Sequence, residues 1–111
     1  MKQKERLKAL LPTLREKERY IKFKILSEEQ VEYADLEAAI WSTLLEYYGE
    51  EGVSRLSLWL IKNLWNPKEQ TGVLKCNNKS VPQVLVGLGL ISRLGDTRVV
   101  FKILGTSGTL Q

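Results

Sequence analysis

The feature that most constrains the fold of this chain is a change of hydrophobic period, from two residues to about 3.6. Residues 19–25 alternate strictly, with Ile21, Phe23 and Ile25 on one side and Tyr20, Lys22 and Lys24 on the other. Such alternation is typical of a β-strand that buries one face and leaves the other open. The sequence therefore predicts a half-buried strand here, with a basic open face.

The helical period covers residues 35–48. Its apolar stripe is Leu36, Ile40, Leu44 and Tyr47. Asp35 precedes the stripe as a predicted N-cap, and Gly49 follows it as a predicted left-handed C-terminal stop. The order of strand and helix in the rest of the chain then decides the fold class.

Four further elements follow from pattern and turn signals. We predict strands over 55–62, 71–77 and 98–104, and a helix from Ser80 to about Leu94 that opens with a Ser80–Gln83 capping box. A short helix over 4–11 precedes Pro12. The order predicts an α+β, ferredoxin-like (RRM-like) split βαβ sandwich: a four-stranded antiparallel sheet with helices on one face, plus an N-terminal helix.

The same patterns divide the chain and assign its surfaces. We predict a basic N-terminal helix and lead-in segment (1–18), a ferredoxin-like domain (19–104) and a short polar tail (105–111). The predicted core is Ile21, Phe23, Ile25, Leu36, Ile40, Leu44, Leu74, Leu85, Leu88, Val99, Phe101 and Ile103. The predicted open sheet face carries Tyr20, Lys22, Lys24, Lys75 and Lys102 beside Val73 and Val100.

Composition excludes most catalytic chemistry. The 111 residues include no histidine and one cysteine, Cys76. The chain therefore cannot supply a Ser-His-Asp triad, a Cys-His pair or an internal disulfide. No apolar run approaches the roughly 18 residues that span a bilayer. The charged start lacks the apolar core of a signal peptide, so we expect no membrane association and a cytoplasmic protein.

Charge is segregated along the sequence. Residues 1–24 carry a net charge of +6, residues 25–51 carry −8, and residues 52–111 carry +6. This segregation predicts a basic surface that attracts a polyanion and an acidic surface that meets a basic partner. A solvated acidic helix explains the middle block equally well.

Three groups of residues are suited to RNA phosphates and bases. The open face supplies lysines, and the lead-in segment supplies basic side chains and one aromatic side chain. Two loops supply amide and hydroxyl groups. These candidates are Arg15, Lys17, Arg19, Tyr20, Lys22, Lys24, Lys75, Asn77, Asn78, Lys79, Ser107, Gly108 and Thr109. Each group also has a structural interpretation, as soluble surface, connection or turn. The strand 71–77 lacks aromatics, which argues against ordinary base stacking.

Other signals are weaker. The acidic cluster Glu28, Glu29, Glu32 and Asp35 offers oxygen ligands for Mg²⁺, but an acidic lead-in to the helix explains it better. Cys76 lies on the predicted inward face of its strand as a small core residue. We interpret the three tryptophans, Trp41, Trp59 and Trp65, as core or interface residues.

Several segments resemble one family. They are residues 11–21 (LPTLREKERYI), 44–52 (LLEYYGEEG), 71–77 (TGVLKCN) and 104–109 (LGTSGT). In this order they resemble the small ferredoxin-like protein subunit of archaeal and eukaryotic ribonuclease P, related to a subunit shared with the mitochondrial-RNA-processing ribonuclease. The long C-terminal extension of many relatives has no counterpart in the sequence. By position, the family's basic segment is matched by Arg15, Lys17, Arg19 and Tyr20, and its terminal motif is matched by residues 107–109.

The resemblance implies a subunit of the ribonucleoprotein that removes the 5′ leader of precursor tRNA. The catalytic Mg²⁺ ions are then expected in the RNA, with no cofactor or metal bound by this chain and no catalytic residue in it. The implied partners are ribonuclease P RNA, precursor tRNA in the holoenzyme, and a TIM-barrel-like protein subunit, often in a two-plus-two assembly that includes a second copy. The alternative is a ferredoxin-like regulatory domain that dimerises through its open sheet without RNA.

Overall fold

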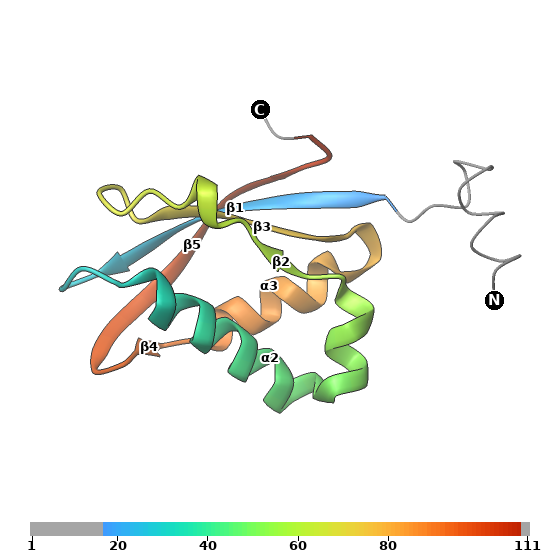
Figure 1. The fold of residues 1–111 in the computed structure, drawn as a ribbon, viewed down its shortest axis with the longest axis horizontal. Helices are drawn as coiled ribbons and strands as arrows, with labels where there is room; N and C mark the ends of the chain where they lie inside the picture. Colours follow the sequence, from blue (N-terminus) through green and yellow to red (C-terminus); the bar gives the residue numbers. More distant parts are fainter. Residues whose placement is uncertain (1–16, 110–111) are drawn as a thin grey trace, which may run out of the picture.

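A computed structural model of the chain describes residues 17–109, which form a sheet and two helices (Figure 1). The predicted N-terminal helix lies outside the described residues. In chain order the elements are β1 (Glu18–Ser27), α2 (Tyr33–Leu56), β2 (Trp59–Leu60), η2 (Lys62–Leu64), β3 (Thr71–Asn77), η3 (Asn78–Ser80), α3 (Val81–Leu90), β4 (Arg93–Leu94) and β5 (Thr97–Ser107).

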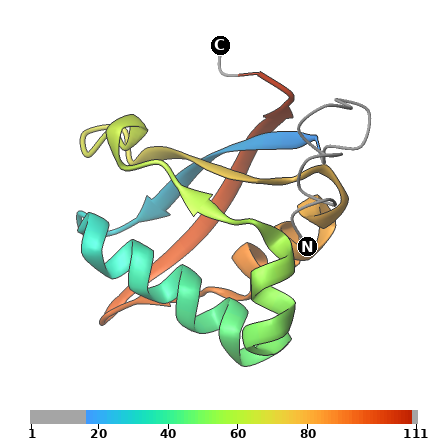
Figure 2. The same ribbon diagram turned by 45° about the vertical axis from the view of Figure 1, so that its right-hand side comes forward.

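The strands form one antiparallel sheet in the order β2-β3-β1-β5-β4. Figures 1 and 2 show α2 and α3 on the same side of this sheet. Within residues 17–109 no helix covers the opposite side, which we call the open face. The prediction of an antiparallel sheet with helices on one face is confirmed, but the sheet has five strands where four were predicted.

Strand β1 lies at the centre of the sheet and separates its two faces. Ile21, Phe23 and Ile25 are almost fully buried beneath the helices, as predicted. Phe23 packs against Phe101 of β5 with ring centroids 5.5 Å apart. On β3, a Cβ at Gly72 would stand 2.7 Å from Cζ of Phe23, so the absence of a side chain at Gly72 makes room for this ring.

Helix α2 is longer than predicted. Gly49 has φ 72° and ψ 173°, a combination that only glycine adopts readily. The predicted positive φ at Gly49 is confirmed, but the residue kinks the helix and does not end it, because helical structure resumes and continues to Leu56. The prediction of a strand over 55–62 was therefore wrong at its start, and only Trp59–Leu60 forms β2. An apolar run with no clear period does not separate the end of a helix from a strand.

Helix α3 is shorter than predicted. It ends at Leu90, and Arg93–Leu94 pairs with β5 as the short strand β4. The predicted capping box is also wrong, because the Ser80 side chain makes no capping hydrogen bond. The backbone N–H of Ser80 instead donates to Oδ1 of Asn77 at 2.9 Å.

Strand β5 extends through Ser107, beyond the predicted boundary at residue 104, because residues 105–107 pair with β1. A register shift between Lys22 and Phe23 accompanies this extension. Ile103, predicted to be buried, is 37% exposed. Leu85 and Phe101 are only partly buried. The other nine predicted core residues are buried.

Candidate nucleic-acid interface

The open face is built from rows of side chains that cross the strands. Residues opposite one another in antiparallel strands point to the same face. One row runs Trp59, Lys75, Tyr20 and Ser107 across β2, β3, β1 and β5. The row therefore places one lysine between two aromatic side chains.

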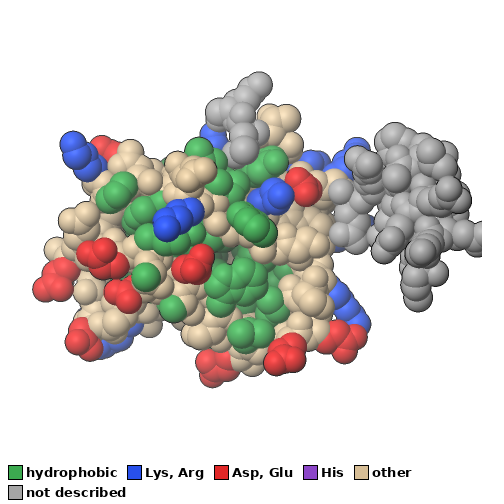
Figure 3. All heavy atoms as spheres, in the orientation of Figure 1, with side chains coloured by type: hydrophobic (Ala, Val, Ile, Leu, Met, Phe, Trp, Pro, Cys, Tyr) green, Lys and Arg blue, Asp and Glu red, His purple; other side chains and the backbone are tan. Residues whose placement is uncertain are grey.

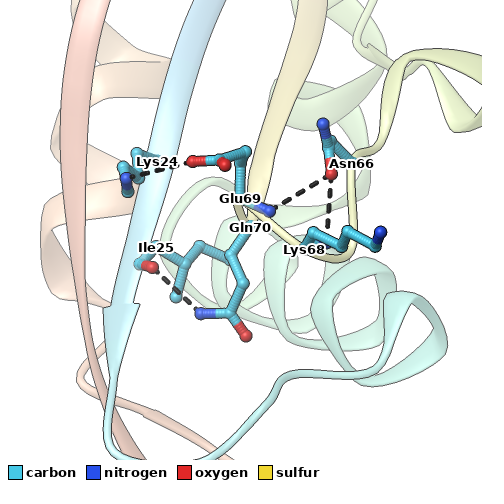
Figure 4. Close-up of polar contacts among 6 residues, drawn as sticks. All are labelled: Lys24, Ile25, Asn66, Lys68, Glu69 and Gln70. Atoms are coloured by element: carbon cyan, nitrogen blue, oxygen red, sulfur yellow. Dashed lines mark hydrogen bonds and ion pairs between the residues drawn. The ribbon is translucent and has the colours of Figure 1, made fainter.

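A second row on the open face contains Thr71, Lys24 and Lys102. Nζ of Lys24 lies 3.8 Å from Oε2 of Glu69, and Figure 4 shows these two side chains pointing toward one another. Nζ of Lys75 similarly lies 3.6 Å from Oε1 of Glu18. Ion pairs at such exposed positions contribute about 0–1 kcal/mol, so a phosphate can replace either carboxylate at little cost.

The loop before β3 holds Glu69 beside Lys24. Oδ1 of Asn66 accepts hydrogen bonds from the backbone N–H groups of Lys68 (3.0 Å) and Glu69 (3.1 Å), which forms a tight turn (Figure 4). Gln70 then fixes the turn to β1, because its Nε2 donates to the carbonyl oxygen of Ile25 at 3.0 Å. The acidic neighbour of Lys24 is thus positioned by the fold.

Three of the predicted segments, the lead-in, the loop after β3 and the terminal motif, meet at one end of the sheet. The backbone N–H of Asn78 donates to the carbonyl oxygen of Lys17 at 2.6 Å, which joins the lead-in segment to the loop after β3. A Cβ at Gly108 would stand 2.9 Å from Nη1 of Arg19, so the guanidinium lies against the terminal motif. The backbone N–H of Thr109 donates to Oγ of Ser107 at 3.1 Å. The lead-in segment, the loop after β3 and the terminal motif therefore come together from distant parts of the sequence.

Within this end of the sheet, Asn77 has a structural role. Its side chain is buried, and Nδ2 donates to the carbonyl oxygen of Arg55 at 2.5 Å while Oδ1 accepts from the N–H of Ser80. The neighbouring Asn78 and Lys79 are exposed. The predicted contact residues of this loop are thus divided between one that holds the fold and two that face solvent. Arg15 lies outside the described residues.

The hairpin of β4 and β5 adds basic residues that sequence reasoning missed. Arg93 and Arg98 are direct cross-strand partners, and both are exposed. They line a hollow of about 620 Å³ together with Ser27 and Ser92. Glu28 also borders the hollow. Opposed like charges destabilise a strand pair unless an anion lies between them. The predicted helix over 80–94 concealed this pair, because it placed Arg93 on a helix.

Comparisons with known proteins identify the family of this chain. The model of the Rpp14/Pop5 family matches residues 19–111. This chain belongs to the Rpp14/Pop5 family. "Ribonuclease P protein component 2" of Pyrococcus furiosus is 40% identical over 107 residues, covering 96% of this chain and 88% of that protein. The protein of the same name from Methanocaldococcus jannaschii is 39% identical, covering 96% of this chain and 77% of its own length.

The fold of this Rpp14/Pop5 family member also has a solved counterpart. A chain in the cryo-EM structure of yeast ribonuclease MRP superposes with a TM-score of 0.65 and 13% identity, covering 87% of this chain and 78% of that one. The predicted family resemblance is confirmed, and so is the predicted function as a protein subunit of the ribonuclease P endoribonuclease. The alternative, a regulatory domain without RNA, is not favoured.

Charge differs between the layers of this family member. The strands carry seven basic residues and one acidic residue, Glu18. The two helices carry five acidic residues and one basic residue, Arg55. Figure 3 shows acidic side chains gathered over α2 and over the segment before it. The predicted basic and acidic surfaces therefore correspond to the sheet and to α2 with its lead-in.

Two titratable side chains of the described region, Cys76 and Tyr33, have pKa values that burial raises. Burial raises the pKa of the Cys76 thiol, which keeps it protonated and unreactive at neutral pH. The pKa of Tyr33 is raised by burial first and by nearby Glu37 second. Between residues 17 and 109, no three acidic or cysteine side chains are grouped as metal ligands. None of the helices over the same range is long and apolar enough to span a bilayer.

Proposed function

We propose that this chain binds the catalytic RNA of ribonuclease P through its open sheet face and performs no bond cleavage itself. The observation that carries the proposal is the open face, where basic residues of β1, β3 and β5 lie side by side and no helix formed by residues 17–109 covers them. Phosphate neutralisation by such a surface releases counterions and drives RNA binding. The convergence of Lys17, Arg19 and the terminal motif supports a further phosphate contact at one end of the sheet.

The chain then assists catalysis by shifting an equilibrium. A protein that binds the cleavage-competent fold of an RNA more tightly than other folds raises the population of that fold. The Mg²⁺ ions that activate the attacking water belong to the RNA in this proposal. The thiol of Cys76 is not a competing nucleophile in this proposal, because it is buried and its pKa is raised.

We assign the architecture to the ferredoxin-like, RRM-like class. The order β2-β3-β1-β5 with both helices on one face supports this assignment. The two-residue strand β4 is then an addition at the sheet edge. RNA-recognition modules of this class bind single strands on the uncovered sheet face.

The acidic helix layer supports a protein partner of complementary charge. We propose that α2 and its lead-in face the TIM-barrel-like subunit, within a two-plus-two assembly that includes a second copy of this chain. Charge complementarity of this kind directs encounter and orientation. In this proposal, precursor tRNA binds to the assembled ribonuclease P particle. A single buried cysteine is compatible with the reducing cytoplasm, where we place the particle.

Cleavage of precursor tRNA tests the proposal. Ribonuclease P RNA should cleave faster with this chain and its candidate partner than without them at limiting Mg²⁺. If about five phosphates are neutralised, the logarithm of RNA affinity should fall with log salt at a slope near −4, using roughly −0.9 per contact for duplex and −0.7 for single strands.

Replacement of the basic residues of the lead-in segment tests whether this segment contacts RNA. The triple variant Arg15→Ala, Lys17→Ala, Arg19→Ala should flatten the salt slope and slow cleavage. The control is Glu46→Gln with Glu50→Gln on α2, which should leave the slope unchanged. A triple variant with the wild-type slope would remove these residues from the interface.

A further inference from the structure

Trp59 differs from the other two tryptophans of the chain. Trp41 and Trp65 are partly buried against the core, and the Trp65 ring lies 6.4 Å from that of Tyr33. Trp59 is 63% exposed, although tryptophan has the largest apolar surface of any side chain. Burial in the core therefore does not explain this residue.

The sheet register places Trp59 in an ordered row. Its direct partner is Lys75, and the next partner along the row is Tyr20. Trp59 and Tyr20 are two strands apart, which is roughly 10 Å. The lysine between them is already held near a carboxylate, Glu18, at 3.6 Å. A flat aromatic surface, a cation and a second aromatic ring thus follow one another across β2, β3 and β1.

We propose that Trp59, Lys75 and Tyr20 form a binding site for unpaired RNA nucleotides. One base stacks on Trp59, a neighbouring base stacks on Tyr20, and Lys75 contacts a phosphate between them. This inference rests on the proposed function and adds the class of RNA that the open face binds. It also differs from the interpretation of β3 alone, whose lack of aromatics argued against ordinary base stacking.

Charge favours RNA over protein as the occupant. The adjoining rows contribute Lys22, Lys24 and Lys102, while the strands carry one acidic residue. The centres of protein interfaces are depleted of lysine, because burial of an ammonium group is costly. When RNA covers the face, its phosphates pair with the lysine ammonium groups, so no cation is left without an anionic partner. The aromatic rings can stack on any nucleobase, because every base has an apolar face.

Binding of a fluorescein-labelled, unstructured RNA decamer to the full-length protein tests the site, with a duplex of the same length for comparison. Trp59→Ala should weaken decamer binding about 5- to 160-fold, the range that corresponds to loss of one stacked base, and should change duplex binding much less. Trp59→Phe should retain most of the affinity. Tyr47→Ala is the matched control, because Tyr47 is 59% exposed on α2 and should not contribute.

A second readout does not depend on loss of affinity. The difference in emission between wild-type protein and Trp59→Phe isolates the fluorescence of Trp59, and the decamer should quench it. Lys75→Ala should reduce the salt slope by about 0.7, whereas Trp59→Ala should leave the slope unchanged. Thermal unfolding of Trp59→Ala should match that of the wild type, because the side chain is exposed.

The outcomes separate the inference from the function on which it rests. Wild-type decamer affinity in Trp59→Ala, with no quenching, would overturn the stacking site even if ribonuclease P RNA still binds with a steep salt slope. Loss of association with the protein subunit in Trp59→Ala, with RNA binding intact, would assign the face to a protein and also overturn it. Failure of the wild type to bind ribonuclease P RNA at low salt would contradict the proposed function.

Discussion

The two faces of the sheet differ although the same strands build both. On β1, Phe23 is fully buried beneath the helices, while Lys24, the next residue, stands on the open face beside Lys102. The covered face is specified by packing, and only apolar side chains of suitable size fit there. The open face has no such requirement, and among its charged side chains the lysines Lys24, Lys75 and Lys102 outnumber the acidic Glu18. The comparison leads us to propose that the covered face determines stability and the open face determines binding.

The helices extend this difference. The strands carry a net charge of +6 and the two helices a net charge of −4. A polyanion approaching the molecule is therefore attracted to the sheet and repelled from α2. Substitutions on the two faces should affect different measurements.

The largest expected effect is on the covered face. Phe23→Ala should lower the free energy of unfolding by about 3–5 kcal/mol, because it leaves a cavity under Phe101 and Gly72. Lys24→Ala, one residue along the same strand, should cost no more than about 1 kcal/mol through loss of the Glu69 ion pair. Urea unfolding of both variants measures the difference. Equal losses would show that the two faces do not divide stability in this way.

The next effect concerns a residue predicted to contact RNA. Asn77→Ala should lower the free energy of unfolding by about 1–3 kcal/mol, because it leaves the carbonyl of Arg55 and the N–H of Ser80 without their partner. The salt slope of RNA binding should stay at the wild-type value. Its exposed neighbour provides the control, since Asn78→Ala should leave stability unchanged. A reduced salt slope with normal stability would return Asn77 to the interface.

A smaller effect is expected from removal of two charges on the open face. Lys24→Ala with Lys102→Ala should reduce the salt slope by about 1.4–1.8 and weaken RNA binding roughly tenfold at moderate salt. Lys62→Ala is the matched control, because the Lys62 ammonium lies over the ring of Tyr33 at 5.8 Å, on the side of α2. Filter binding over a range of salt concentrations measures both. An equal change in the control would mean that RNA does not distinguish the faces.

The smallest effect is a pH dependence of stability. Burial raises the pKa of Cys76 above its ordinary value of 9.0, so the folded chain keeps the thiol proton that the unfolded chain releases. The associated stability is present below that ordinary value and is lost as pH rises. The free energy of unfolding of the wild type should therefore fall more steeply than that of Cys76→Ala between about pH 8 and pH 10. Parallel pH profiles would contradict this role of burial.

Local pattern predicted the covered face well. The alternation at Ile21, Phe23 and Ile25 and the stripe at Leu36, Ile40 and Leu44 identified buried residues, because burial on one face imposes its own period. Where pattern failed, long-range pairing decided the structure. The end of β5 reads as a mobile tail, and it becomes a strand only because β1 offers partners to residues 105–107.

The candidate site was less predictable for a similar reason. Lys24 and Lys75 were assigned to the open face from alternation alone, and the register confirms that placement. Trp59 lies in a run that is apolar on both sides, so its direction depends on the pairing of β2 with β3. Arg93 and Arg98 become neighbours only when β4 forms. Such juxtapositions have no signal within a short window of sequence.

Lysine footprinting with and without ribonuclease P RNA tests the central claim most directly. Acetylation of the native protein, read by mass spectrometry, reports on each lysine of the two faces in one experiment. Bound RNA should protect Lys24, Lys75 and Lys102 and leave Lys62 reactive. Protection of Lys62 with unchanged reactivity of the three sheet lysines would contradict an RNA interface on the open face.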